Sequence, residues 1–189
     1  MRERRIKLAL SRFWKERDPS ADILAVDEIN IGQGRTRADL VVVGDGFYGF
    51  EIKGPRDSLS RLSRQLEDYR SVFDEIHVVI GLKHLDGVLQ EIPSWCGVLL
   101  LSEIGGLIEI DVFRASRKNY DQNRLALAQL LWRDEALSVL KKKGHSQGVL
   151  SKPRAVIWER LAERLSAPEI SSEVQAAFRK RGKKWRDAL

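Results

Sequence analysis

The sequence is poor in the residues that build disulfides and metal–thiolate sites. Its single cysteine, Cys96, cannot form an internal disulfide, and one thiol without further cysteines does not indicate a zinc site. No apolar run approaches the roughly 20 residues that a membrane helix needs. A chain that is 43% hydrophobic and 32% charged therefore predicts a globular, cytoplasmic protein with no membrane partner.

Several signatures of enzymes and of targeting are also missing. The sequence has no internal repeat, no glycine-rich loop of the phosphate-cradling kind, and no spacing that indicates a Ser-His-Asp arrangement. The basic start at residues 1–5 is not followed by a cleavable apolar segment, so we expect no targeting peptide. His77 lies alone inside an apolar run, where a histidine is more often a hydrogen-bonded core residue than a catalytic base.

Positive charge is concentrated in the C-terminal part of the chain. The net charge is +6, and residues 141–189 carry thirteen Lys and Arg against five Asp and Glu, a net +8 that leaves −2 for residues 1–140. A basic extension beside a near-neutral region suits a polyanion, although a solvated helical surface has the same composition. The linker-like segment 144–151 predicts one domain over residues 1–145 and a basic helical extension over residues 150–189.

Two apolar stretches that flank a glycine-containing turn at 44–46 predict a β-hairpin. A three-residue turn with Gly46 in the left-handed conformation pairs Val43 with Phe47. A two-residue turn instead slips the register by one residue. The two alternatives send the side chain of Asp39, near the start of the first strand, to opposite faces of the sheet.

Charged residues interrupt both predicted strands. Ionised side chains inside strands cost free energy unless they pair or bind a metal. Glu51 and Lys53 are two residues apart and therefore leave the same face of their strand. With the three-residue turn, Asp39 lies directly opposite Glu51. If the preceding loop at 32–34 is symmetric, Glu28 comes opposite Asp39, close to the same patch.

A helix is expected to follow the hairpin. Asp57 is a natural N-cap for a helix from Ser58 to about Phe73. Tyr69 belongs to the apolar stripe that must face the sheet, with its hydroxyl reaching a polar partner. Gln65 lies at the edge of that stripe, from which it points either to the surface or into a site.

This arrangement resembles the PD-(D/E)XK nuclease superfamily over residues 25–81, with alanine instead of proline before the first aspartate. The resemblance rests on a charged hairpin, a preceding acid and a Q-x-x-x-Y helix, that is, on Asp39, Glu51, Lys53, Glu28, Gln65 and Tyr69. It implies a restriction-endonuclease-like core of the α/β (α+β) class. In such a fold a mixed β-sheet is flanked by helices, and the C-terminal segment is a helical extension.

The resemblance also implies an activity, namely Mg²⁺-dependent hydrolysis of phosphodiester bonds, with DNA as the substrate and Mn²⁺ as a substitute ion. The metal ligands that it implies are the side chains of Asp39, Glu51 and Glu28 and the backbone carbonyl of Ile52. Lys53 would stabilise charge in the transition state and Gln65 would position the attacking water. The catalytic set is then Asp39, Glu51, Lys53, Gln65 and Glu28.

Phosphate contacts are expected from cations around the hairpin and from the basic tail, namely Arg37, Arg56, Arg61, Arg64, Lys141, Lys142 and Lys143. A charged exterior helix face would look the same. Two alternatives to the nuclease therefore stay open. One is a non-catalytic nucleic-acid-binding module of the same fold, with the basic tail as the working surface. The other is a partner-binding protein that forms a homodimer through its C-terminal helices.

Overall fold

One six-stranded mixed sheet organises the fold, which a computed structural model describes for residues 3–17 and 22–182. The strands lie side by side in chain order: β1 (Leu24–Ile31), β2 (Thr36–Val43), β3 (Phe47–Lys53), β4 (Glu75–Gly81), β5 (Gly97–Ile104) and β6 (Leu107–Arg114). The pairs β3–β4 and β4–β5 are parallel and the other pairs are antiparallel. The predicted mixed sheet is confirmed.

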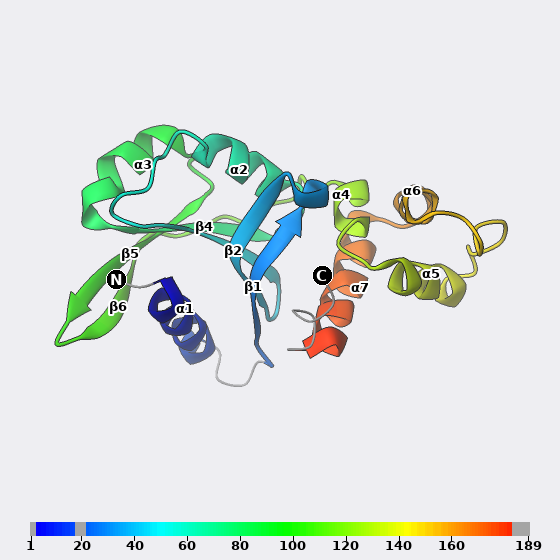
Figure 1. The fold of residues 1–189 in the computed structure, drawn as a ribbon, viewed down its shortest axis with the longest axis horizontal. Helices are drawn as coiled ribbons and strands as arrows, with labels where there is room; N and C mark the ends of the chain where they lie inside the picture. The colour runs from blue at the N-terminus through cyan, green and yellow to red at the C-terminus, as the bar shows by residue number, and fades with distance from the viewer. Residues whose placement is uncertain (1–2, 18–21, 183–189) are drawn as a thin grey trace.

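Helices cover both faces of the sheet (Figure 1). α1 (Glu3–Arg17) lies on one face, while α2 (Leu62–Arg70) and α3 (Leu85–Glu91) lie on the other. Parallel strands need such crossover connections, and α2 and α3 supply them after β3 and β4. Because side chains alternate along a strand, β2 and β3 feed two separate apolar cores, one under each helix layer.

The C-terminal helices lie beyond the β1–β2 side of the sheet in Figure 1. They are α4 (Arg124–Ala128), α5 (Arg133–Lys142), α6 (Arg154–Arg164) and α7 (Ala167–Arg181). Their apolar sides join the core of the α2 face: the Phe178 ring packs on the Phe47 ring at 5.6 Å, and the Trp158 indole donates to the Leu131 carbonyl at 3.0 Å. These apolar sides therefore have partners within the chain and do not need a second copy to cover them. The predicted homodimer is not tested by these contacts and stays a prediction.

Two short 3₁₀ turns complete the fold, η1 (Gly32–Gly34) and η2 (Leu82–His84). The first closes the β1–β2 loop, and the second follows β4 directly. Within residues 3–17 and 22–182, none of the helices combines the length and the apolar character that crossing a bilayer would require.

The predicted start of α2 is wrong by several residues. The helix begins at Leu62 and not at Ser58. Asp57 caps no helix, because its carboxylate accepts a hydrogen bond from the Gly54 amide at 2.7 Å. The Ser58 hydroxyl bonds to the amide and the side chain of Ser60. Local bonds of this kind compete with helix formation, so the segment 54–61 forms a loop before α2.

Candidate functional site

The β2–β3 hairpin has the predicted register. Val43 pairs with Phe47 across a three-residue turn, and Leu40 pairs with Phe50. The pairing of the two strands ends there, and the next residue of β2, Asp39, bonds through its side chain to the Ile52 amide. The predicted left-handed conformation of Gly46 is wrong, since Gly46 is not among the residues with positive φ. The Gly44 amide instead donates to the Gly46 carbonyl at 2.9 Å and closes the turn.

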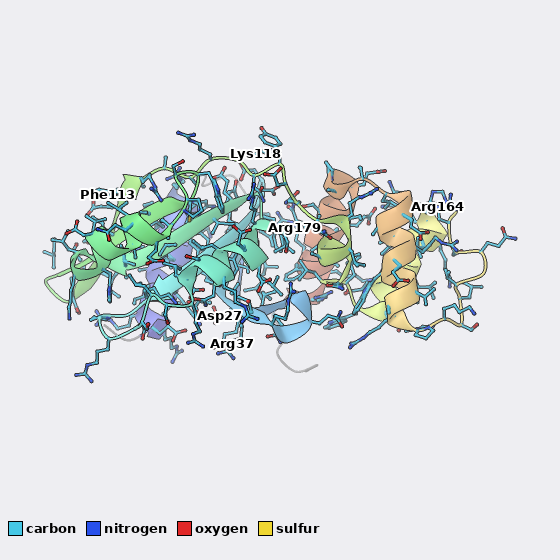
Figure 2. The ribbon with its side chains drawn as sticks, turned by 90° about the horizontal axis from the view of Figure 1, so that it is seen from above. Asp27, Arg37, Phe113, Lys118, Arg164 and Arg179 are labelled. Atoms are coloured by element: carbon cyan, nitrogen blue, oxygen red, sulfur yellow. The ribbon has the colours of Figure 1, made fainter. Side chains whose placement is uncertain are left out.

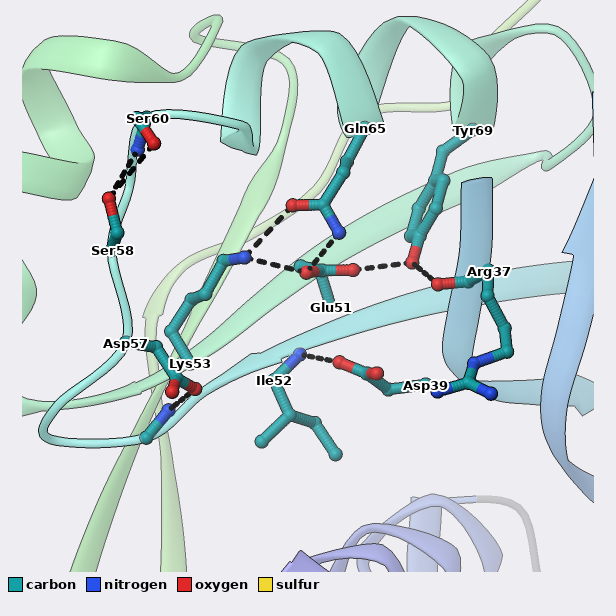
Figure 3. Close-up of polar contacts among 11 residues, drawn as sticks. Arg37, Asp39, Glu51, Ile52, Lys53, Asp57, Ser58, Ser60, Gln65 and Tyr69 are labelled. Carbon is teal, nitrogen blue, oxygen red and sulfur yellow. Dashed lines mark hydrogen bonds and ion pairs between the residues drawn. The ribbon is translucent and has the colours of Figure 1, made fainter. Parts of the chain in front are cut away.

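Glu51 is the centre of a buried polar network that joins β3 to α2 (Figure 3). Its Oε1 receives the Lys53 ammonium at 2.8 Å and the Gln65 side-chain amide at 2.6 Å. Its Oε2 accepts the Tyr69 hydroxyl. Lys53 also donates to the Gln65 side-chain carbonyl oxygen at 2.9 Å. Lys53 and Gln65 therefore bond to each other as well as to the Glu51 carboxylate. The prediction that the Tyr69 hydroxyl reaches a polar partner is confirmed.

This network explains how a charged pair can lie inside the sheet. Glu51 is 2% exposed and Lys53 is 6% exposed. An isolated carboxylate at such a position would be strongly unfavourable, and it is tolerated where a counter-charge and hydrogen-bond donors satisfy its oxygens. Gln65 faces Glu51 and Lys53 and not the surface. Three side chains of the predicted site, Glu51, Lys53 and Gln65, are therefore brought together, and they satisfy one another.

Asp39 lies at the edge of this network and bonds to the backbone. Its Oδ2 accepts a hydrogen bond from the Ile52 amide at 2.7 Å. The contact with Ile52 is made by its N–H, whereas the resemblance implied a role for its carbonyl. Burial, and next the negative charge of Glu51, raise the pKa of Asp39 from 3.8 to about 6. The Asp39 carboxyl group therefore takes up a proton at about pH 6, well above the pH at which an exposed aspartate does.

Glu28 lies in β1 but does not join Glu51. The pairs Asp27–Leu40 and Ile29–Ala38 leave Glu28 across from Asp39, as the symmetric loop predicted. Its backbone has a φ of 59°, which costs a residue other than glycine about 1–2 kcal/mol. Its side chain is 51% exposed. It approaches two cations, the Lys7 ammonium at 3.7 Å and the Arg37 guanidinium at 3.5 Å.

The acidic residues do not offer a divalent ion a suitable set of ligands. Mg²⁺ takes oxygen ligands in a near-octahedral arrangement. In the described part of the chain, no group of three or more His, Cys, Asp or Glu side chains could hold a metal ion. Glu51 is occupied by an ammonium group and two neutral donors, and Glu28 is paired with cations. The Mg²⁺ prediction, with Mn²⁺ as a substitute, therefore rests on the sequence alone.

The cations expected to contact phosphates differ in their surroundings. Arg56, Arg61 and Arg64 are exposed around the loop before α2, and none of them forms an ion pair within residues 3–17 and 22–182. The other four lie elsewhere: Arg37 pairs with Glu28, Lys142 with Glu173 at 2.8 Å, Lys143 with Glu169 at 3.2 Å, and Lys141 is exposed without an ion pair to the described residues.

A second polar cluster lies on the α1 face and has no signature in the sequence. The Ser116 hydroxyl connects the carboxylate of Glu75 with the imidazole of His77. Ser116 follows β6, so about forty residues separate it from its partners. Only the order of the strands in the sheet brings the three side chains together. The expectation of a hydrogen-bonded core histidine agrees with this environment.

Comparison with known proteins identifies a family. The family described as "Bacteriophage P4 protein cII" matches residues 1–189, the whole chain. Protein cII of Enterobacteria phage P4 is 25% identical over 144 residues, which are 76% of this chain and 54% of that protein. The chain thus spans about half the length of this curated relative. No solved structure matches the chain.

These findings overturn the identification as a PD-(D/E)XK nuclease, and with it the predicted phosphodiester hydrolase activity. The family that covers every residue is not a nuclease family. The geometry gives a physical reason for the misleading resemblance: Glu51, Lys53 and Gln65 have the spacing of a catalytic motif, but they bond to one another inside the sheet. The chain belongs to the bacteriophage P4 protein cII family.

Proposed function

We propose that this protein binds double-stranded DNA as a non-catalytic module, through phosphate contacts made by the α5–α6 end of the molecule. The observation that carries the proposal is the charge of this end. Residues 141–164 carry seven Lys and Arg against two Glu. Four of these cations are exposed and form no ion pair with the described residues; we call them the basic end: Lys141, Lys152, Arg154 and Arg164.

The basic end is suited to a polyanion by its position as well as its charge. α5, α6 and the loop between them form the end of the molecule farthest from β6, and Figure 2 places Arg164 on α6 there, with Phe113 toward the other end. The helices that carry these cations are anchored by buried residues such as Trp158 and Leu161. An exposed, rigidly mounted set of cations can approach a duplex without rearrangement of the core.

Double-stranded DNA attracts such a surface strongly, because it carries a negative charge every 1.7 Å or so along its axis. Each phosphate that is neutralised releases condensed counterions, which makes the affinity depend on salt. Since these contacts read no bases, the proposed binding is independent of sequence.

The test compares two variants with the same loss of charge. In the first, the four cations of the basic end are replaced by Gln. In the matched control, four exposed cations around the loop before α2, also without ion pairs to the described residues, are replaced by Gln: Arg56, Arg61, Arg64 and Lys83. Binding to a labelled duplex is measured by fluorescence anisotropy at several salt concentrations.

We expect the basic-end variant to lose affinity and salt dependence, and the control to keep most of both. A loss of affinity in the control variant alone would contradict the proposal, because it would place the DNA contact at the loop before α2 and not at the basic end. Affinity for duplex DNA that is unchanged in both variants, or absent from the wild type at low salt, would contradict the proposal. Circular dichroism establishes that both variants are folded.

A further inference from the structure

A cavity of about 540 Å³ lies on the α1 face of the sheet, near the C-terminal end of α1. This is the face opposite to the Glu51 network, because Tyr48, Phe50 and Ile52 of β3 belong to the core under α1, while Glu51, between Phe50 and Ile52, contacts Gln65 and Tyr69 of α2. The volume lies within the range of small-molecule sites, about 300–1,000 Å³. Its lining includes Trp14, Tyr48, Asp45, Glu75, His77 and Ser116.

Aromatic rings form a continuous wall of this cavity. The Trp14 ring contacts the Tyr48 ring at 4.8 Å between centroids and meets the His77 ring edge-on at 5.1 Å. The face of an aromatic ring carries negative electrostatic potential and attracts a cation within about 6 Å of its centre. The Arg17 guanidinium, at the rim of the cavity, lies 5.2 Å from the centroid of Trp14 and demonstrates that this ring accepts such a group.

His77 contributes a neutral imidazole with one unused acceptor. The Ser116 hydroxyl donates to Glu75, so the contact of 3.0 Å between Ser116 and His77 must be donated by the histidine Nε2–H. Nδ1 is then an acceptor, and it is buried without a hydrogen-bond partner in the described part of the chain. Burial, and next the charge of Arg17, lower the pKa of His77 to about 3.

The two carboxylates of the cavity bond to hydroxyl groups, although the cation Arg17 also lies at its rim. Asp45 accepts the Tyr48 hydroxyl, and Glu75 accepts the Ser116 hydroxyl. Neither forms an ion pair with a cation within residues 3–17 and 22–182, although the chain carries a net charge of +6. Two carboxylates with neutral donors beside an aromatic wall form a site with negative potential, and a phosphate group would be repelled from it.

We propose that this cavity binds a small organic cation, a guanidinium or ammonium compound whose charged group stacks on the Trp14–Tyr48 wall and pairs with Glu75 and Asp45. The volume accommodates a molecule longer than the charged group alone. Arg17 occupies part of the same wall, so the ligand has to displace it.

The displacement of Arg17 gives the proposal a test in which two variants have effects of opposite sign. The probe is agmatine, which carries a guanidinium and an ammonium group, and binding to the full chain is measured by isothermal titration calorimetry. We expect saturable binding to the wild type at millimolar concentration or below. Glu75→Gln should weaken it at least tenfold, while Arg17→Ala should strengthen it, because a like charge leaves the rim.

Matched controls separate a specific site from general charge effects and from misfolding. Glu109→Gln removes an exposed carboxylate of β6 that does not line the cavity, and it should leave agmatine binding unchanged. Asp45 lies in an exposed turn, so Asp45→Asn should fold. It should also weaken agmatine binding, and it takes the place of Glu75→Gln if that variant fails to fold. The inference is overturned if the wild type shows no saturable binding, if Glu75→Gln binds as the wild type does, or if Arg17→Ala weakens binding.

Discussion

Removal of the Lys53 ammonium is the perturbation that tests the buried network most severely. In Lys53→Met, Glu51 stays 2% exposed but loses its counter-charge, and keeps only the donors of Gln65 and Tyr69. Loss of one partner from a buried ion pair costs about 3–5 kcal/mol. Against a total stability of about 5–15 kcal/mol, this is a large part of the free energy of unfolding.

A second substitution should restore most of that loss. In Glu51→Gln/Lys53→Met the buried charge is gone, and the new amide oxygen still accepts one hydrogen bond. We expect the double variant to be only about 1–2 kcal/mol less stable than the wild type, the cost of an imperfectly satisfied polar group. The second substitution should thus recover about 1–4 kcal/mol relative to Lys53→Met, a coupling of the size expected for residues in direct contact.

The assay is unfolding by urea at neutral pH, followed by circular dichroism and extrapolated linearly to water. If the free energy of unfolding of Lys53→Met is within about 1 kcal/mol of that of the wild type, the reasoning is refuted. Removal of a buried counter-charge should cost more than that. The same result would follow if the Lys53 ammonium stood free in a solvent-filled site. A double variant no more stable than Lys53→Met would contradict the pairing of these two side chains.

Two further substitutions have defined outcomes. The pKa of Asp39 is raised to about 6 in the folded chain, so its ionisation opposes folding as the pH rises from about 4 to 6. Asp39→Asn should therefore stabilise the protein by about 1–3 kcal/mol at neutral pH and by much less near pH 4. Urea unfolding at the two pH values measures the difference. Gly49→Ala places a Cβ atom 2.3 Å from the Phe73 ring and should destabilise by about 1–3 kcal/mol, whereas Gly81→Ala, which meets no atom within 4 Å, should not; thermal melts of the two variants distinguish them.

The sequence predicted the local geometry of the hairpin well, because that geometry depends on few quantities. Turn length fixes the register, and side-chain alternation then decides that Glu51 and Lys53 share a face. The Gly46 conformation was not predictable in the same way, since a bond between Gly44 and Gly46 closes the turn without positive φ at Gly46. The start of α2 was missed because the local bonds of Asp57 and Ser58 compete with a helical cap.

The chemistry of the site could not be read from spacing in this chain. The residue types and intervals that resemble a nuclease motif are compatible with a metal site and with an internally paired network. Which of the two forms depends on whether Gln65 and Tyr69 of α2 face Glu51, and that is decided by the packing of α2 on the sheet. The cluster of Glu75, His77 and Ser116 was unpredictable for the same reason, because it joins β4 to a residue that follows β6.

The salt dependence of DNA binding tests the proposed function most directly. For wild type and the basic-end variant, the logarithm of the affinity for a labelled duplex is plotted against the logarithm of the salt concentration. If all four cations contact phosphates, the variant should lose about 3–4 units of slope, at 0.9 or so for each contact. The duplex should be recovered intact from both. Equal slopes for the two proteins would contradict the account.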